Sequence, residues 1–202
     1  MLAHQLPVQW TYRDYQRWEG RWELIDGLAY NMPPSPNQEH QEIVGDLFNQ
    51  FYSGLKGKSC KAFVAPFDVL MPQGNETAGN VRTVVQPDIV IVCDKTKLDG
   101  KRCKGAPDLV VEVVSPSTAR RDVKDKLRLY ETAGVQEYWI VYPEQRNVWV
   151  FSQQTGGGYG RPDTYGEGDQ IAVGIFPDLM IDLTTVFPGE PLAAAAENPE
   201  QA

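Results

Sequence analysis

The chain has 202 residues, 42% of them hydrophobic, and a formal net charge of −8 at neutral pH. This composition suits one compact domain. With 27 acidic against 19 basic residues, it argues against a protein that coats nucleic acid, since phosphate contacts need lysine and arginine. No stretch approaches the ~20 apolar residues that cross a bilayer, and residues 1–15 lack the basic start and apolar core of a secretory signal, so we expect no membrane association.

The N-terminal part predicts a short helix, a hairpin and a longer helix. The first helix, over residues 11–19, begins with Thr11, a residue type that caps helix N-termini. Residues 21–32 alternate around an Asp-Gly pair, a strong signal for a two-residue hairpin turn. After a proline-rich connector, Asn37 can cap a helix over residues 38–55, where apolar residues recur at helical spacing.

The middle of the chain alternates strands with a helix. Apolar, β-branched runs predict strands at residues 61–71, 84–93, 108–114 and 137–142. A helix from about residue 119 to residue 133, capped by Ser117 or Thr118 and closed by Gly134, connects the last two strands. A strand–helix–strand unit of this kind is expected to be parallel, with a right-handed crossover.

The rest of the chain predicts further strands. Residues 147–152 are expected to pair antiparallel with the preceding strand across a short turn. Two short strands, near residues 170–176 and 179–183, are expected to extend the sheet. We take residues 1–190 as a single domain and predict that residues 191–202 are disordered, because they have little apolar surface to bury. The order of elements predicts an α/β fold with a mixed central sheet.

Cysteine usage bears on the cellular compartment. The three cysteines, Cys60, Cys93 and Cys103, are scattered along the chain. Their odd number argues against a disulfide framework, and their spacing fits no zinc motif. We therefore expect a reducing, cytoplasmic setting.

Glu112 stands in the middle of an otherwise apolar strand. An ionised carboxylate buried there is costly unless a buried arginine or a metal ion offsets the lost hydration. Asp88 lies at the entry of the preceding strand, beside Pro87, whose missing N–H group loosens strand pairing. Two carboxylates on two apolar strands are suitable ligands for a hard divalent cation such as magnesium.

Three other residues are weaker candidates. Lys126 falls at the edge of the buried stripe of its helix and is expected to lean toward the sheet, although Asp122, four residues earlier, could hold it in a purely structural pair. His40 shares the buried face of its helix and could be either a packing residue or part of a site. Glu23, in the hairpin, could be an ordinary exposed strand residue.

Basic residues flank the Glu112 strand on both sides. They could form two solvated faces, or a positive rim that touches nucleic acid around one acidic centre. The members of this candidate rim are Lys101, Arg102, Lys104, Arg120 and Arg121.

Several motifs in a fixed order resemble the Uma-type endonuclease family of the PD-(D/E)XK nuclease superfamily. They are Gln86-Pro87-Asp88, Val111 to Thr118 (VEVVSPST), Asp122…Lys126…Tyr130, and Gly134 to Val141 (GVQEYWIV). The segment Glu23 to Gly27, and Ser35-Pro36 followed by His40, are similar to the N-terminal signature of that family. The likeness covers about residues 20 to 187.

This resemblance implies a fold and a mechanism. The fold is a restriction-endonuclease-like mixed sheet flanked by helices, with an N-terminal hairpin extension. The implied activity is magnesium- or manganese-dependent hydrolysis of DNA phosphodiester bonds, with the metal held by Asp88, Glu112 and the Val113 carbonyl. The superfamily pattern has a lysine two residues after the acid, where this chain has Val114, and Lys126 is expected to take that lysine's place. His40 would contact phosphate or position water.

Other functions stay open. The acidity of the chain and the valine at position 114 favour a catalytically degenerate binding or assembly module with the same fold. A metal-dependent hydrolase of a small phosphoester is a third possibility. We expect low affinity for DNA because of the net negative charge. Superfamily nucleases often pair, so a homodimer is also possible, and Tyr138, Trp139 and Trp149 could form either its interface or the core.

Overall fold

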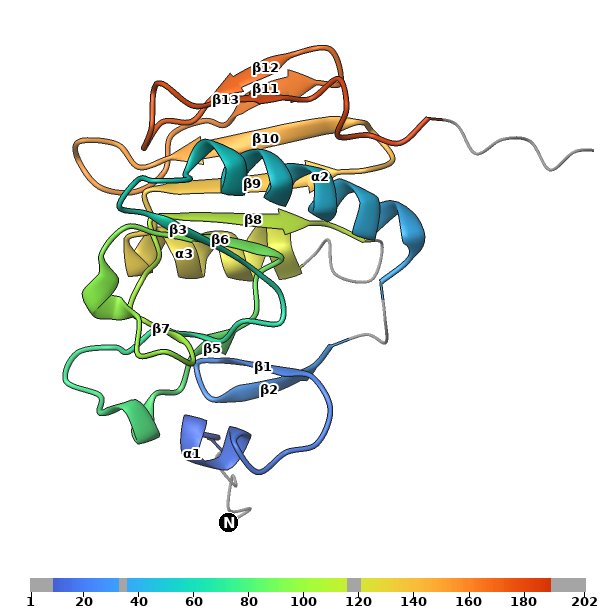
Figure 1. Cartoon of the computed structure of the whole chain (residues 1–202). Helices are drawn as coiled ribbons and strands as arrows, with labels where there is room; N and C mark the ends of the chain where they lie inside the picture. Colours follow the sequence, from blue (N-terminus) through green and yellow to red (C-terminus); the bar gives the residue numbers. More distant parts are fainter. Residues whose placement is uncertain (1–8, 33–35, 116–120, 190–202) are drawn as a thin grey trace, which may run out of the picture.

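The computed structural model describes residues 9–32, 36–115 and 121–189, and a six-stranded mixed sheet is its centre (Figure 1). In spatial order the strands are β11 (Asp163–Gly166), β10 (Asn147–Ser152), β9 (Glu137–Tyr142), β8 (Leu109–Val113), β6 (Ile89–Val92) and β3 (Lys61–Val64). The neighbours β8 and β9 are parallel, and the other pairs are antiparallel. The predicted mixed sheet and its parallel unit are confirmed.

Helices cover both faces of this sheet (Figure 1). On one face lies α2 (Gln38–Gly54), whose first turn is capped by the side chain of Asn37, as predicted. On the other lies α3 (Leu127–Ala133), which continues from a π-helix over Arg121–Lys126 and ends at Gly134, at φ 83°. No helix in the described ranges combines the length and apolar character needed to span a bilayer.

Alternate residues of β8 and β9 serve two cores. Val111, Val113 and Trp139 pack with the apolar side of α2, and Val110 and Tyr138 pack with α3. Tyr138 and Trp139 are fully buried, so they are core residues of this chain.

A second sheet of five short strands lies beside the first (Figure 1). Its order is β2 (Leu28–Asn31), β1 (Trp22–Ile25), β5 (Val84–Val85), β4 (Val69–Leu70) and β7 (Cys103–Lys104). The strands expected at residues 61–71 and 84–93 are therefore each divided between two sheets. The breaks lie next to Pro66 and Pro87, because proline has no N–H group to donate to a continuing ladder.

The N-terminal hairpin extension forms the outer part of this second sheet. Residues Asp26 and Gly27, at φ 51° and 79°, make the turn between β1 and β2, as the two-residue signal predicts. Before it, α1 (Tyr12–Tyr15) is a single turn that begins after Thr11 with a capping box to Asp14. Short 3₁₀ turns occupy Ala78–Asn80 and Lys95–Lys97.

The C-terminal strands differ from the prediction. β12 (Gln170–Ala172) and β13 (Met180–Asp182) pair with each other in a separate sheet and do not extend the central one. β11 occupies the edge position beside β10. Its sequence is short and polar, so no apolar run predicted a strand there. The expected tail at residues 191–202 and the caps Ser117 and Thr118 lie outside the described residues.

The expectation from the cysteine count was wrong. Cys60 and Cys93 form a disulfide, and Cys103 is free and buried. Cys60 directly precedes β3 and Cys93 directly follows β6, and the pairing of Lys61 with Val92 brings the two cysteines opposite each other. The argument from cysteine usage for a reducing compartment therefore no longer holds.

Candidate active site

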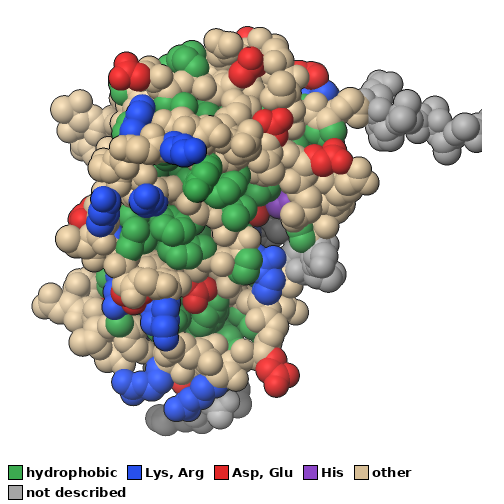
Figure 2. All heavy atoms as spheres, viewed as in Figure 1, with side chains coloured by type: hydrophobic (Ala, Val, Ile, Leu, Met, Phe, Trp, Pro, Cys, Tyr) green, Lys and Arg blue, Asp and Glu red, His purple; other side chains and the backbone are tan. Residues whose placement is uncertain are grey.

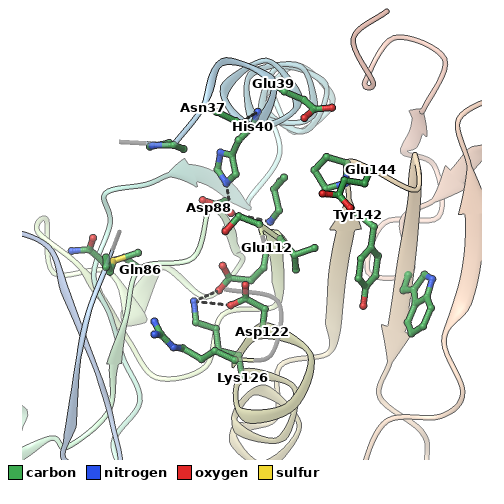
Figure 3. Close-up of a pocket in the computed structure, with 18 of the residues that line it drawn as sticks. Asn37, Glu39, His40, Gln86, Asp88, Glu112, Asp122, Lys126, Tyr142 and Glu144 are labelled. Carbon is green, nitrogen blue, oxygen red and sulfur yellow. Dashed lines mark hydrogen bonds and ion pairs between the residues drawn. The ribbon is translucent and has the colours of Figure 1, made fainter. Parts of the chain in front are cut away.

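Asp88, directly before β6, and Glu112, in β8, lie at one end of the central sheet. Ile89 of β6 pairs with Val111 of β8, and continuing this antiparallel register by one residue puts Asp88 opposite Glu112. Directly opposed residues point to the same face of a sheet, so the two carboxylates lie near each other (Figure 3). The structure thus brings together the two carboxylates among the three predicted metal ligands.

Glu112 is buried, with only 6% of its side chain exposed. Its Oε1 atom accepts hydrogen bonds from Lys126 Nζ at 2.9 Å and from the Tyr130 hydroxyl at 2.7 Å. Burial raises the pKa of Glu112, and the Lys126 ammonium offsets only part of this effect because Asp122, Asp88 and Glu23 add further negative charge. The buried cation beside Glu112 is therefore a lysine, where the sequence suggested an arginine or a metal ion.

Lys126 is held by three carboxylates. Its ammonium lies 2.9 Å from Glu112 Oε1, 2.9 Å from Glu23 Oε1 and 3.5 Å from Asp122 Oδ1. Burial alone would lower the pKa of Lys126, but these carboxylates raise it well above its usual range, so the amine stays charged. The expected lean toward the sheet and the expected pair with Asp122 both occur. The π-helix that carries Lys126 is a local geometry often found at functional sites.

Glu23 is the residue that sequence reasoning undervalued. A hairpin position is compatible with an ordinary exposed strand residue, yet Glu23 is completely buried. Its Oε1 atom accepts a hydrogen bond from the backbone N–H of Gln86 at 3.1 Å as well as from Lys126. The available signal was an acid flanked by Trp22 and Leu24 in a short apolar strand, the same signal that singled out Glu112.

His40 and Val113 hold Asp88 from two sides. Asp88 Oδ2 accepts a hydrogen bond from the backbone N–H of Val113 at 2.8 Å, and His40 Nε2 lies 3.3 Å from the same oxygen. Burial lowers the pKa of His40, but the hydrogen bond and charge of Asp88, together with the Val113 backbone and the charge of Asp122, make the net shift of this pKa upward. Because Asn37 caps α2 through the backbone N–H of His40, the start of this helix places the imidazole over the carboxylate (Figure 3).

Within the described part of the chain, each of the two predicted carboxylate ligands keeps one oxygen without a partner. Among the described residues, no hydrogen bond or ion pair is made by Asp88 Oδ1 or by Glu112 Oε2, while the other oxygen of each is held. In the same part of the chain, no group of three or more His, Cys, Asp or Glu side chains has the arrangement of a metal site. An ion at this position would rely on these two carboxylates, a backbone carbonyl and non-protein oxygens.

The carboxylates line a cavity of about 810 Å³. Among the described residues around it, six are acidic and three are lysine or arginine. The acidic residues are Glu23, Glu39, Asp88, Glu112, Asp122 and Glu144, and the basic ones are Arg21, Arg121 and Lys126. Tyr142, at the end of β9, lies across the cavity from Asp88 and Glu112 (Figure 3), and Trp149 of β10 also lines it.

The candidate basic rim does not form one feature around this cavity. Arg121 lines the cavity and stacks on Tyr30, with its guanidinium carbon 4.6 Å from the ring centre. Arg102 and Lys104 instead pair with Asp99, at 3.1 Å and 3.0 Å, and do not line it. Figure 2 shows the Lys and Arg side chains of this face in separate groups. Of the two remaining rim residues, Lys101 does not line the cavity, and Arg120 lies outside the described residues.

Comparisons with known proteins agree with this architecture. The sequence model of the Uma2 family, described as "Putative restriction endonuclease", matches residues 12–184. An uncharacterized protein from Synechocystis sp. is 28% identical over 149 residues, which are 70% of this chain and 74% of the relative. A crystal structure from Anabaena variabilis, described as a "putative nuclease belonging to DUF820", superposes with a TM-score of 0.69 at 17% identity and covers 88% of this chain and 97% of that one. At that identity the superposition establishes the shared fold.

Proposed function

The chain belongs to the Uma2 family of proteins described as restriction endonucleases, and on this basis we propose that it is a metal-dependent endonuclease that hydrolyses phosphodiester bonds in DNA. One observation carries the proposal. A pair of opposed carboxylates, Asp88 and Glu112, lies at a cavity with a charged lysine 2.9 Å from one of them. This combination provides a place for a cation, a place for a phosphate and an ammonium group beside both.

The residues present fit a magnesium or manganese ion. Asp88 Oδ1 and Glu112 Oε2 have no partner among the residues that the structure describes, and the Val113 carbonyl follows Glu112 directly in the chain, so the donor set consists of hard oxygen atoms. The acidic surplus around the cavity also favours a divalent cation, which would relieve the repulsion that contributes to the raised pKa of Glu112. A bound ion of this kind polarises a phosphate and acidifies a water molecule.

The protein's own residues orient the ligands and the reacting groups. Tyr130 and Lys126 fix Glu112 through Oε1, and the Val113 N–H and His40 fix Asp88 through Oδ2. In the proposed mechanism the Lys126 ammonium orients the attacking water and offsets the charge that develops on the phosphate. Glu23 is a positioning residue for Lys126, because it is buried and bound to the amine.

A second candidate function is supported by the same lysine. All contacts of Lys126 within the described residues go to carboxylates, which is also what a purely structural ion cluster would show. With Val114 at the position of the usual superfamily lysine, the chain could be a binding or assembly module that keeps the nuclease fold without cleavage.

A cleavage assay separates these functions. The protein is incubated with single-stranded, duplex and branched DNA in the presence of Mg²⁺ or Mn²⁺, with chelator and with Asp88→Asn as controls. The endonuclease proposal expects internal cuts that disappear in both controls. A folded protein that cuts none of these substrates with either metal would favour the module. Hydrolysis of an aryl phosphate ester without cleavage of DNA would instead indicate a small-molecule phosphoesterase.

A further inference from the structure

The cavity has an aromatic wall that the proposed hydrolysis does not use. Tyr142 and Trp149 come from the neighbouring strands β9 and β10, and their ring centres lie 5.1 Å apart. Both side chains are partly exposed, and both line the cavity. The amides of Gln145 and Asn147 line the same cavity. Partly exposed aromatic rings beside amides provide a stacking face together with donors and acceptors for the edge of a base.

The size of the cavity limits what can reach this wall. A volume of about 810 Å³ lies within the range of sites for small molecules and cofactors. A phosphodiester group that reaches Asp88 or Glu112 brings its own base into the same space, because the carboxylates and the aromatic wall line one cavity (Figure 3). In an intact duplex that base is paired and covered on both faces by its stacked neighbours, so its face is not available to Tyr142 or Trp149.

The charge of the cavity also favours a single strand over a duplex. Proteins that bind duplex DNA through its backbone neutralise many phosphates with lysine and arginine. Among the described residues around this cavity only Arg21, Arg121 and Lys126 are lysine or arginine, and Lys126 is already held by carboxylates. Binding of a single strand can rely on base stacking to a greater extent, because every base has an aromatic face.

We propose that the cavity binds an unpaired nucleotide next to the scissile phosphate, with its base stacked on Tyr142 and Trp149, so that the preferred substrate is single-stranded or locally unpaired DNA. This inference rests on the proposed endonuclease function and adds the form of DNA that the site accepts. It assigns to Tyr142 and Trp149 a role in substrate choice, separate from the residues that act on the phosphate.

Binding measurements test the proposal without relying on catalysis. The probes are a short single strand with one 2-aminopurine, the same strand paired with its complement, and the same strand with an abasic site at that position. They are titrated against the parent protein with Ca²⁺, and a gel verifies that the strand stays intact. We expect the single strand to bind roughly 5- to 150-fold more tightly than the duplex, the range that stacking of one base provides, and the 2-aminopurine fluorescence to fall on binding.

Variants locate the effect in the aromatic wall. Trp149→Ala should remove most of the preference for the single strand, and Trp149→Phe should retain it because a ring remains. Tyr142→Ala tests the same wall from β9 and covers the case in which Trp149→Ala does not fold, as judged from its melting curve. Tyr52→Ala is the matched control, since Tyr52 is 59% exposed on α2 and does not line the cavity.

The outcomes separate this inference from the proposed function. Equal affinity for single strand and duplex, or unchanged fluorescence and affinity in folded Trp149→Ala and Tyr142→Ala proteins, would overturn the stacking site even if the protein cuts DNA. Stacking on the wall without any cut by the parent protein in Mg²⁺ would leave the binding site in place and remove the endonuclease function.

Discussion

Asp88 and Glu112 are opposed carboxylates that repel each other, and this repulsion contributes to the raised pKa of Glu112. Its pKa is raised by burial, and the charges of Asp122, Asp88 and Glu23 act in the same direction. Lys126 is the direct counter-charge, at 2.9 Å. At the scale of single residues, the site therefore holds more negative charge than its own lysine neutralises, which favours the entry of a divalent cation.

The first prediction concerns the two ligands. Asp88→Asn and Glu112→Gln should each weaken Mn²⁺ binding by more than about 100-fold, because loss of a direct ligand should exceed the losses caused by changes in outer-shell partners. The fold should survive, since the oxygens that accept hydrogen bonds from Val113 and Lys126 can be kept. Calorimetric titration gives the affinities. Glu144→Gln is the control, since Glu144 lines the same cavity but is exposed, and unchanged Mn²⁺ affinity in both ligand variants would remove the metal site.

The second prediction concerns stability around Lys126. Lys126→Met should lower the free energy of unfolding by ~3–5 kcal/mol, because it removes the buried ammonium that Glu23 and Glu112 both contact at 2.9 Å. Adding Glu112→Gln to Lys126→Met should recover part of this loss. Urea denaturation measures both effects.

An exposed neighbour provides the control for this experiment. Lys124 lies in the same π-helix and is exposed, so Lys124→Met should change the free energy of unfolding by less than ~0.5 kcal/mol. A Lys126→Met protein as stable as the parent would show that the ion cluster contributes little to the fold, and would contradict the buried cluster described for Lys126.

The sequence was informative about these residues to different degrees. Glu112 and Asp88 could be found because an acid within an apolar run has few explanations, and Lys126 because it adjoins the buried stripe of its helix. Glu23 carries the same local signal, but its burial could not be predicted, because the burial of a hairpin residue depends on what covers the hairpin. The buried partner of Glu23 is Lys126, which comes from a segment about a hundred residues away in the sequence.

At the scale of elements, local patterns predicted α2 and the parallel unit well. They overestimated the first helix, expected over residues 11–19 but found only as α1, and did not predict how strands are shared between sheets. The segment of β8, α3 and β9 has a clear apolar period and a glycine at the helix end, and its strands pair as expected. The runs at residues 61–71 and 84–93 look continuous in hydrophobicity, yet each contributes to two sheets. Only the tertiary arrangement decides to which sheet each half belongs.

The third prediction concerns the start of β9. Glu137 is 1% exposed and accepts hydrogen bonds from the Trp139 indole at 2.7 Å and from the backbone N–H of Ile175 at 3.2 Å. Glu137→Gln should lower stability by ~1–3 kcal/mol, because an amide NH₂ replaces one accepting oxygen and leaves a donor unpaired. Thermal and urea unfolding measure the change, and exposed Glu144→Gln should differ little from the parent. A stabilised Glu137→Gln protein would mean that the burial that raises the pKa of Glu137 outweighs these hydrogen bonds.

At the scale of the molecule, the candidate site lies where separate parts of the fold meet. The central sheet supplies Asp88 and Glu112, the second sheet supplies Glu23, α2 supplies His40 and the π-helix supplies Lys126. The net charge of −8 belongs to the whole chain, whereas the acidic surplus around the cavity arises because the fold brings these separate parts together. They predict how the protein responds to ions when it binds DNA.

The fourth prediction is that binding of a single strand depends on divalent ions more than on basic side chains. Adding Ca²⁺, which takes similar oxygen ligands, should tighten binding at least about tenfold, or 1.4 kcal/mol, in the parent but not in Asp88→Asn. Since three basic side chains line the cavity among the described residues, the slope of log affinity against log salt should be shallower than about −2. Fluorescence anisotropy measures both quantities. A steep slope together with no effect of Ca²⁺ would mean that DNA binds along a basic surface elsewhere, and removing the charges of Lys101, Arg102 and Lys104 would then weaken binding.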